Sequence, residues 1–172
     1  MRRYFLDASA LSKRYVAEAG SDKVVRLMDS LAADRFICVT LGVGEVLATI
    51  NRRVNEHRLT RSAGDKAFSD VAHEVLQNAD ILKLPMPDEV VVPGFAYIRK
   101  HNLNTTDAVI LHAALKIQDT LPRKDSLVVV AADERLVRAA RAEGLETLDP
   151  VHDSDEHLDA LLYEPPPAPL AL

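Results

Sequence analysis

The stretch YFLDASAL, which covers residues 4–11, decides how this chain is expected to fold. A short apolar run ends abruptly in Asp7, and a segment with helical character follows at once. This pattern predicts a buried strand over residues 3–6 and a helix over residues 8–16. In an open parallel α/β sheet, such strand ends lie along one edge, and ligands bind in the crevice there.

Three further acidic residues, Glu45, Asp107 and Asp133, are expected at comparable positions, where predicted strands pass into helices. Two like unit charges about 4 Å apart repel by roughly 4 kcal/mol at an effective dielectric constant of 20. Four carboxylates at one edge must therefore stay partly protonated or hold a divalent cation. Ligand sets made only of oxygen suit hard ions such as Mg²⁺ or Mn²⁺. The pattern favours a metal-dependent phosphodiesterase.

The composition is that of an ordinary globular domain. The chain has 172 residues, of which 48% are hydrophobic and 27% are charged, and 21 Lys and Arg face 26 acids, for a formal net charge of −5. This acidic balance argues against a general nucleic-acid coat protein. It leaves room for a nuclease, because acids that bind metal are neutralised and local basic patches can still hold phosphates.

The sequence also indicates the cellular compartment of the protein. The single cysteine, Cys38, lies in an apolar run and cannot form an internal disulfide, which is typical of a reducing cytosol. We find no signal-peptide pattern and no apolar run long enough to cross a membrane. The expected location is therefore cytoplasmic, without membrane association.

The alternation of strand and helix patterns predicts an α/β fold, an open parallel β-sheet with helices on both faces. Further strands are expected over residues 35–39, 80–84, 127–131 and 145–148. Thr40, Thr60 and either Thr105 or Thr106 are candidate N-caps. Helices are expected from Ser21, after Thr40, from Thr60, and over residues 87–101, 107–117 and 134–143.

The four acidic segments together resemble the PIN-domain nucleases, specifically the toxin subunits of VapBC-type toxin–antitoxin pairs. The resemblance rests on YFLDASAL at Asp7, GEV at Glu45, TTDA at Asp107 and ADERL at Asp133, and it runs from about residue 3 to residue 148. It implies a single PIN-like nuclease domain over residues 1–148. Residues 149–172 are then a C-terminal extension, with a possible short helix at 156–163 and an extended Pro-rich tail.

The resemblance also implies the site and its chemistry. Asp7, Glu45, Asp107 and Asp133 correspond to the metal-binding and catalytic acids of the family, and Ser9 to a hydroxyl that supports the first acid. Thr106 is expected to play a similar supporting part. Many relatives have Ser or Thr two residues before the fourth acid, where this chain has alanine, so support for Asp133 is expected to be weaker.

An endoribonuclease follows from the resemblance, with water attacking the RNA phosphodiester to leave a 5′-phosphate and a 3′-hydroxyl. The site chemistry does not demand the ribose 2′-hydroxyl, so the choice of RNA rests on the resemblance alone. The family further implies a homodimer that is inhibited by a small antitoxin protein.

Five basic residues are candidates for contact with the substrate backbone. The densest basic stretch follows the Glu45 helix, and two further cations lie close to Asp7; the candidates are Lys13, Arg14, Arg52, Arg53 and Arg58. The alternative for each is a solvated helix end, where cations complement the helix dipole.

The sequence leaves two other functions open. One is a PIN-like module that binds without catalysis, which the alanine before Asp133 keeps open. The other is a phosphotransfer protein with Asp7 as phosphoacceptor. Haloacid-type phosphatases need a second acid where this chain has Ser9, and receiver domains need an acidic pair that is missing, so this alternative is weaker.

Overall fold

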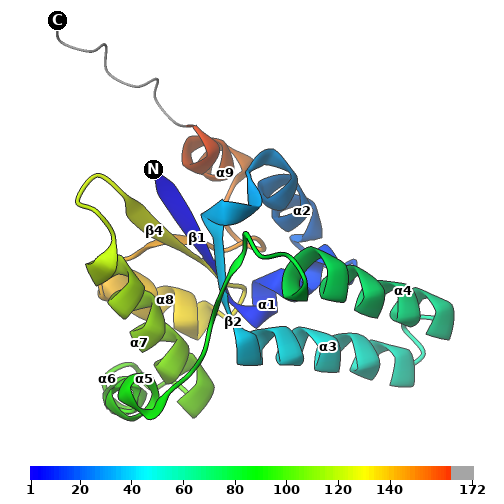
Figure 1. Ribbon diagram of the computed structural model, residues 1–172, viewed down its shortest axis with the longest axis horizontal. Helices are drawn as coiled ribbons and strands as arrows, with labels where there is room; N and C mark the ends of the chain where they lie inside the picture. Colours follow the sequence, from blue (N-terminus) through cyan, green and yellow to red (C-terminus); the bar gives the residue numbers. More distant parts are fainter. Residues whose placement is uncertain (164–172) are drawn as a thin grey trace, which may run out of the picture.

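The computed structural model describes residues 1–163, and its centre is a sheet of five strands, all parallel (Figure 1). The strands lie in the order β3-β2-β1-β4-β5. Their bounds are β1 Arg2–Leu6, β2 Phe36–Val39, β3 Leu82–Leu84, β4 Ser126–Val130 and β5 Glu146–Leu148. The predicted α/β fold with a parallel sheet is confirmed.

The strands form because short apolar runs can be buried on both faces of a parallel sheet. All four residues of β2 are buried, and so are the last four of β4. Alternate side chains of β1 then enter two separate cores, with Tyr4 and Leu6 on one face of the sheet and Phe5 on the other.

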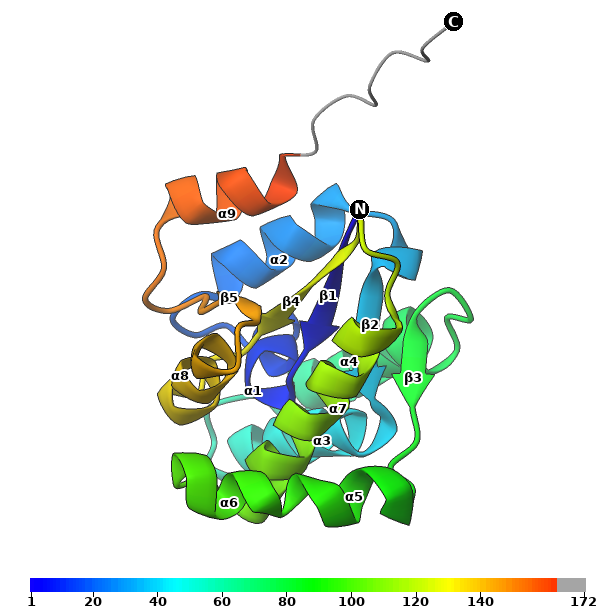
Figure 2. The ribbon, with the colours of Figure 1, turned by 90° about the vertical axis from the view of Figure 1, so that its left-hand side faces the viewer.

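Helices cover both faces, as predicted (Figures 1 and 2). The Tyr4 face packs against α1 Ala8–Leu11, α2 Ser21–Ser30, α3 Thr40–Asn55, α4 Arg61–Val71, the π-helical turn η3 Ala72–Leu76 and α9 Asp155–Leu162. The Phe5 face packs against α5 Asp88–Gly94, α6 Ala96–His101, α7 Thr105–Thr120 and α8 Glu134–Ala142. Two short turns, η1 Ser12–Arg14 and η2 Ala33–Arg35, complete the connections.

Two predicted N-caps are wrong. The helix α3 begins at Thr40 itself, after Val39, and no side chain caps it. The cap of α7 is Asn104, whose side chain accepts a hydrogen bond from the backbone N–H of Asp107. Thr60 does cap α4, through a hydrogen bond from Ala63 N.

The single helix predicted over residues 87–101 is two helices, α5 and α6, joined at Phe95. Pro93 near the break lacks the N–H that a continuous helix would use. Gly94 explains the close approach of α5 to α7, because a Cβ at this position would lie 3.0 Å from the Cα of Val109.

The chain after β5 returns to the Tyr4 face, where α9 lies beside α2 (Figure 2). Leu158 and Leu161 of α9 are buried in the core of that face. The predicted Pro-rich tail lies outside the described residues. Within residues 1–163, no helix is long and apolar enough to span a membrane.

Candidate active site

The strand order places two of the acids together. The order reverses between β1 and β4, and ligands of open α/β sheets bind at such a reversal, beyond the carboxyl ends of the strands. Asp7 follows β1 directly, and Asp133 follows β4 by three residues. The backbone N–H of Asp7 donates to the carbonyl of Val130, 3.0 Å away, and so fixes the two strand ends side by side.

Asp7 is held rigidly. Its Oδ2 accepts hydrogen bonds from Ser9, one from the backbone N–H at 2.9 Å and one from the hydroxyl at 2.5 Å. The Ser9 hydroxyl oxygen also accepts from the backbone N–H of Ala132 at 2.9 Å. A single hydroxyl therefore connects Asp7 to the loop that carries Asp133.

Asp133 is the N-cap of α8. Its Oδ1 accepts from the backbone N–H groups of Arg135 and Leu136, and the Arg135 side chain lies 3.8 Å away. Ala131, the residue where relatives of the resembled family carry a hydroxyl, is completely buried in the core. Ser9 reaches the neighbouring peptide of Ala132 instead.

Glu45 and Asp107 are supplied by helices. Glu45 lies in the second turn of α3, and Asp107 in the first turn of α7. The expectation that every acid follows a strand is wrong for Asp107, because α7 is preceded by α6 rather than by a strand. The helix α7 nevertheless starts at the same edge of the sheet, and its N-terminal dipole favours an acid there.

Three of the four carboxylates have raised pKa values, and the charge of at least one neighbouring acid contributes to each rise. Burial and the charge of Asp133 raise the pKa of Asp7, whose hydrogen bonds from Ser9 oppose the rise. Burial and then Asp7 raise the pKa of Glu45. Burial, Asp133 and Asp7 raise the pKa of Asp107 to about 6, against a smaller lowering by Arg135.

Whether a divalent cation would fit among these acids can be judged from which carboxylate oxygens lack a partner. The Asp107 Oδ2 atom is buried and has no hydrogen-bond partner, which is a costly arrangement for a carboxylate. Glu45 likewise has no ion pair or hydrogen bond within residues 1–163. Oxygen donors without partners fit a hard cation such as Mg²⁺ or Mn²⁺. In the part of the chain that the structure describes, however, no three acidic, His or Cys side chains converge into a ready-made cation site.

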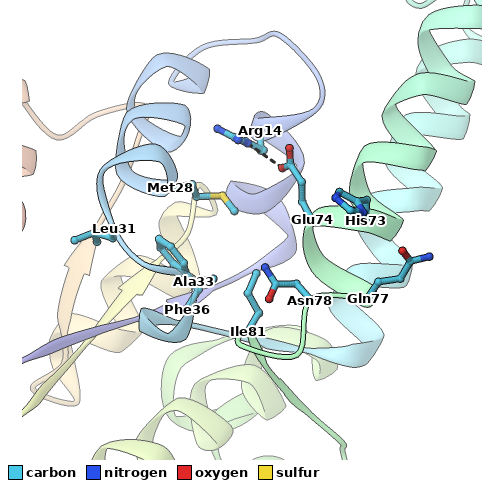
Figure 3. A pocket seen from close by; sticks show the side chains of 10 residues that line it. All are labelled: Arg14, Met28, Leu31, Ala33, Phe36, His73, Glu74, Gln77, Asn78 and Ile81. Carbon is cyan, nitrogen blue, oxygen red and sulfur yellow. Dashed lines mark hydrogen bonds and ion pairs between the residues drawn. The ribbon is translucent and has the colours of Figure 1, made fainter.

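Three of the candidate substrate contacts are engaged within the protein. Lys13 is only 6% exposed, and its Nζ lies 2.8 Å from Glu18, which also pairs with Arg53 at 2.8 Å. Arg14 pairs with Asp29 and Glu74. Figure 3 shows Arg14 and Glu74 at a cavity of about 560 Å³ between α2 and η3, which none of the four acids lines.

The other two candidate cations are more accessible. Arg52 is exposed at the end of α3 and donates to the hydroxyl of Thr49, while Arg58 is exposed and lies 3.5 Å from Glu56. Thr106, the second expected supporting residue, is exposed in the first turn of α7. Contact with a substrate stays a prediction for all of these residues.

One buried acid was not singled out from the sequence. Asp149 follows β5 as Asp7 follows β1, and it is only 4% exposed. Burial raises the pKa of Asp149, but hydrogen bonds from the His152 ring and from backbone N–H groups outweigh this and lower it. The position of Asp149 directly after a predicted strand could have identified it from the sequence.

Comparison with protein families identifies the class of the protein. The PIN-domain family matches residues 4–142, which is most of the chain. The chain therefore belongs to the PIN-domain family. No curated protein matches the sequence significantly.

Solved structures with the same fold include one toxin and one complex with DNA. The FitAB complex bound to an IR36 DNA fragment matches with a TM-score of 0.62 and 17% identity, over 90% of this chain and 99% of the other. VapC20 of Mycobacterium tuberculosis, a toxin that cleaves the sarcin–ricin loop, matches with a TM-score of 0.57 and 15% identity, over 79% and 94%. FitAcB from Neisseria gonorrhoeae gives 0.57 and 17%, over 87% and 99%.

Proposed function

We propose that this protein is a divalent-metal-dependent endoribonuclease and the toxin of a toxin–antitoxin pair. The observation that carries the proposal is the gathering of Asp7, Glu45, Asp107 and Asp133 at one sheet edge with too little positive charge around them. Arg135 is the cation that offsets part of this charge. A site of this kind gains from a divalent cation, because hard cations bind carboxylate oxygens.

The four acids would hold Mg²⁺ or Mn²⁺, which lowers the pKa of a bound water and polarises the scissile phosphate. The protein side chains do the positioning. Ser9 fixes the Asp7 carboxylate and the Ala132 peptide together, and the α8 N-terminus fixes Asp133. No protein nucleophile is needed, because water attacks the phosphate and the 3′-oxygen leaves.

RNA as substrate is supported by a similar structure, and a small protein as inhibitor is supported by the resemblance to the toxins of VapBC-type pairs. VapC20 is a toxin that cleaves the sarcin–ricin loop, an RNA. We extend both properties to this chain, together with a homodimer and a cytoplasmic location. An antitoxin that brings a basic side chain to the acids would replace the charge of the metal.

The phosphoacceptor alternative is opposed by the surroundings of Asp7. This residue is 8% exposed and its Oδ2 is occupied by two hydrogen bonds. A non-catalytic binding module remains the second candidate, because no ready-made cation site exists among residues 1–163.

The test is cleavage of labelled total RNA with Mg²⁺ or Mn²⁺ and with EDTA, using the wild-type chain and Asp7→Asn. Asp65→Asn, at an exposed acid of α4, is the matched control. We expect the wild-type chain and Asp65→Asn to cut RNA only with metal, and Asp7→Asn to lose at least about 100-fold in rate, on the scale of lost electrostatic groups. Cleavage that survives both EDTA and Asp7→Asn would refute the mechanism, and a wild-type chain inactive on every RNA would favour the binding module.

A further inference from the structure

A mostly apolar cavity of about 160 Å³ opens beside Glu45. Glu45 is one of its lining residues, so the cavity and the acidic site share a wall. Its other walls come from the end of β2, the start of α3, the segment after β3, and the helices α5 and α7. The apolar lining consists of Val39, Leu41, Met86, Val91, Val109 and Ile110.

The cavity, called the slot below, has buried residues on one side and an exposed residue on another. Val109 and Ile110 of α7 are 7% and 4% exposed, whereas Leu41 of α3 is 64% exposed. A ligand that enters past Leu41 would reach the side chains of α7.

One wall offers hydrogen bonds. Thr105 and Thr106 line the cavity in the first turn of α7, and both residues are exposed. Their hydroxyls make no hydrogen bond within residues 1–163. A threonine hydroxyl both donates and accepts, so this wall can pair with either kind of polar edge.

The size limits the ligand. Sites for drug-sized molecules measure about 300–1,000 Å³, so this cavity has room for a single flat ring system and little more. A ligand with two apolar faces and a polar edge matches these walls. Bases of single-stranded RNA are bound in this way, splayed out of the strand, with their faces on side chains and their edges hydrogen-bonded.

We propose that the cavity binds one base of the single-stranded nucleic-acid substrate, next to the phosphate that is cut. The inference rests on the proposed function, because Glu45 belongs both to the acidic site and to the cavity. A strand whose phosphate lies at the acids brings an adjacent base to the slot. The slot then gives the nuclease a nucleotide preference at one position beside the cut.

The first experiment measures binding without metal and without cleavage. The four ribonucleosides carry no phosphate, so they can be titrated in EDTA while the methyl signals of Val109 and Ile110 are followed by NMR. Val91→Phe fills the cavity, and Val92→Phe adds the same ring on the neighbouring residue, which is 58% exposed and does not line the cavity. Melting temperatures check that both variants fold.

We expect at least one nucleoside to shift the α7 methyl signals in the wild-type chain and in Val92→Phe. Val91→Phe should weaken this binding by roughly tenfold or more, the effect of a lost apolar pocket. Absence of methyl shifts with all four nucleosides, or shifts that Val91→Phe leaves unchanged, would overturn the base site. This result does not depend on whether the chain cleaves RNA.

The second experiment sequences the ends that are produced from a random-sequence RNA. We expect one position beside the cut to show a nucleotide preference that Val91→Phe reduces by about tenfold while Val92→Phe preserves it. Cleavage with the same nucleotide preference in both variants would support the proposed nuclease function and refute the proposed base site. The competing occupant is a second copy of the chain, and it is indicated if the α7 methyl signals respond to protein concentration and not to nucleosides.

Discussion

At the scale of single residues, the acidic site is a balance between repulsion and a few fixed contacts. Asp107 shows the repulsion most clearly, because its buried Oδ2 has no partner and its pKa rises to about 6. Ser9 provides the fixed contacts, since its hydroxyl donates a hydrogen bond to the Asp7 carboxylate and accepts one from the Ala132 N–H. We therefore expect replacement of Asp107 to stabilise the metal-free protein and replacement of Ser9 to destabilise it.

Asp107→Asn should stabilise the metal-free protein near neutral pH. The folded pKa of about 6 lies above the reference value of 3.8, so the folded state binds protons more tightly and loses stability as the pH rises from about 4 to 6. The shift is worth roughly 3 kcal/mol at face value, and partial exposure reduces it to on the order of 1 kcal/mol. Urea unfolding in EDTA between pH 4.5 and 7.5 measures the gain.

Asp88→Asn is the control, because Asp88 is an exposed acid in the first turn of α5. Its replacement removes a favourable interaction with the helix dipole and should not stabilise the protein. An Asp107→Asn variant whose advantage is the same at pH 4.5 and at 7.5 contradicts the proposed repulsion.

Ser9→Ala should destabilise the protein by about 1–3 kcal/mol, because the Ala132 N–H and the Asp7 carboxylate both lose a partner. Thermal or urea unfolding measures the loss. Ser12→Ala, which removes a longer hydrogen bond of 3.4 Å to the carbonyl of Ser9, should cost clearly less. Equal losses in the two variants would show that the Ser9 hydroxyl has no special structural part.

At the scale of elements, helix ends and strand ends deliver the acids, and charge pairs hold the helices in place. The Glu18 carboxylate is central to this, because it joins Lys13 of η1 to Arg53 of α3. Burial raises the pKa of Glu18, but these two cations outweigh burial and lower it. Lys13 is therefore placed to position α3, and with it Glu45.

Lys13→Met should lower the free energy of unfolding by roughly 1–3 kcal/mol, since Glu18 would lose the buried one of its two cationic partners. Lys116→Met, at an exposed position of α7, is the control and should change stability little. If Lys13→Met keeps full stability but weakens RNA binding, Lys13 acts in substrate contact, as the sequence indicated, rather than in the fold.

The sequence predicted the elements well because each carries a local signal. The apolar run before Asp7 and the apolar run of β4 after Ser126 favour buried strands in a sheet covered on both sides. The break between α5 and α6 was missed, although Pro93 is a local signal against a continuous helix. The cap of α7 was missed because three polar residues in succession, Asn104 to Thr106, could each have served.

The sequence predicted the arrangement of the site less completely than it predicted the helices and strands. Strand order decides that Asp7 and Asp133 meet, and the alternation of strands and helices implied this. The arrival of Asp107 from a helix preceded by another helix depends on long-range packing, as does the engagement of Lys13 with Glu18. No local pattern encodes such contacts.

At the scale of the whole molecule, the sheet separates two cores, and the end of the chain belongs to one of them. The predicted domain ends at residue 148, yet α9 places Leu158 and Leu161 in the core with Tyr4. The Tyr4 hydroxyl also donates to the carbonyl of Leu161 at 2.8 Å. We therefore expect the folded unit to include α9.

Leu158→Ala should destabilise the entire domain by about 2–5 kcal/mol, as for other buried leucines. Leu162→Ala, at a partly buried position of the same helix, should cost less. A single cooperative unfolding transition that moves to lower urea supports a unit that includes α9. Loss of α9 helicity alone, with the main transition unchanged, would restore the boundary at 148.

The most direct test of the central claim is calorimetric titration of Mn²⁺ into the wild-type chain, Asp7→Asn, Asp107→Asn and Asp65→Asn. If the four acids form one cation site, the wild-type chain and Asp65→Asn bind Mn²⁺ saturably, and Asp7→Asn and Asp107→Asn each lose that binding. Equal Mn²⁺ binding in the wild-type chain and in both site variants, or no binding in the wild-type chain, would contradict the account.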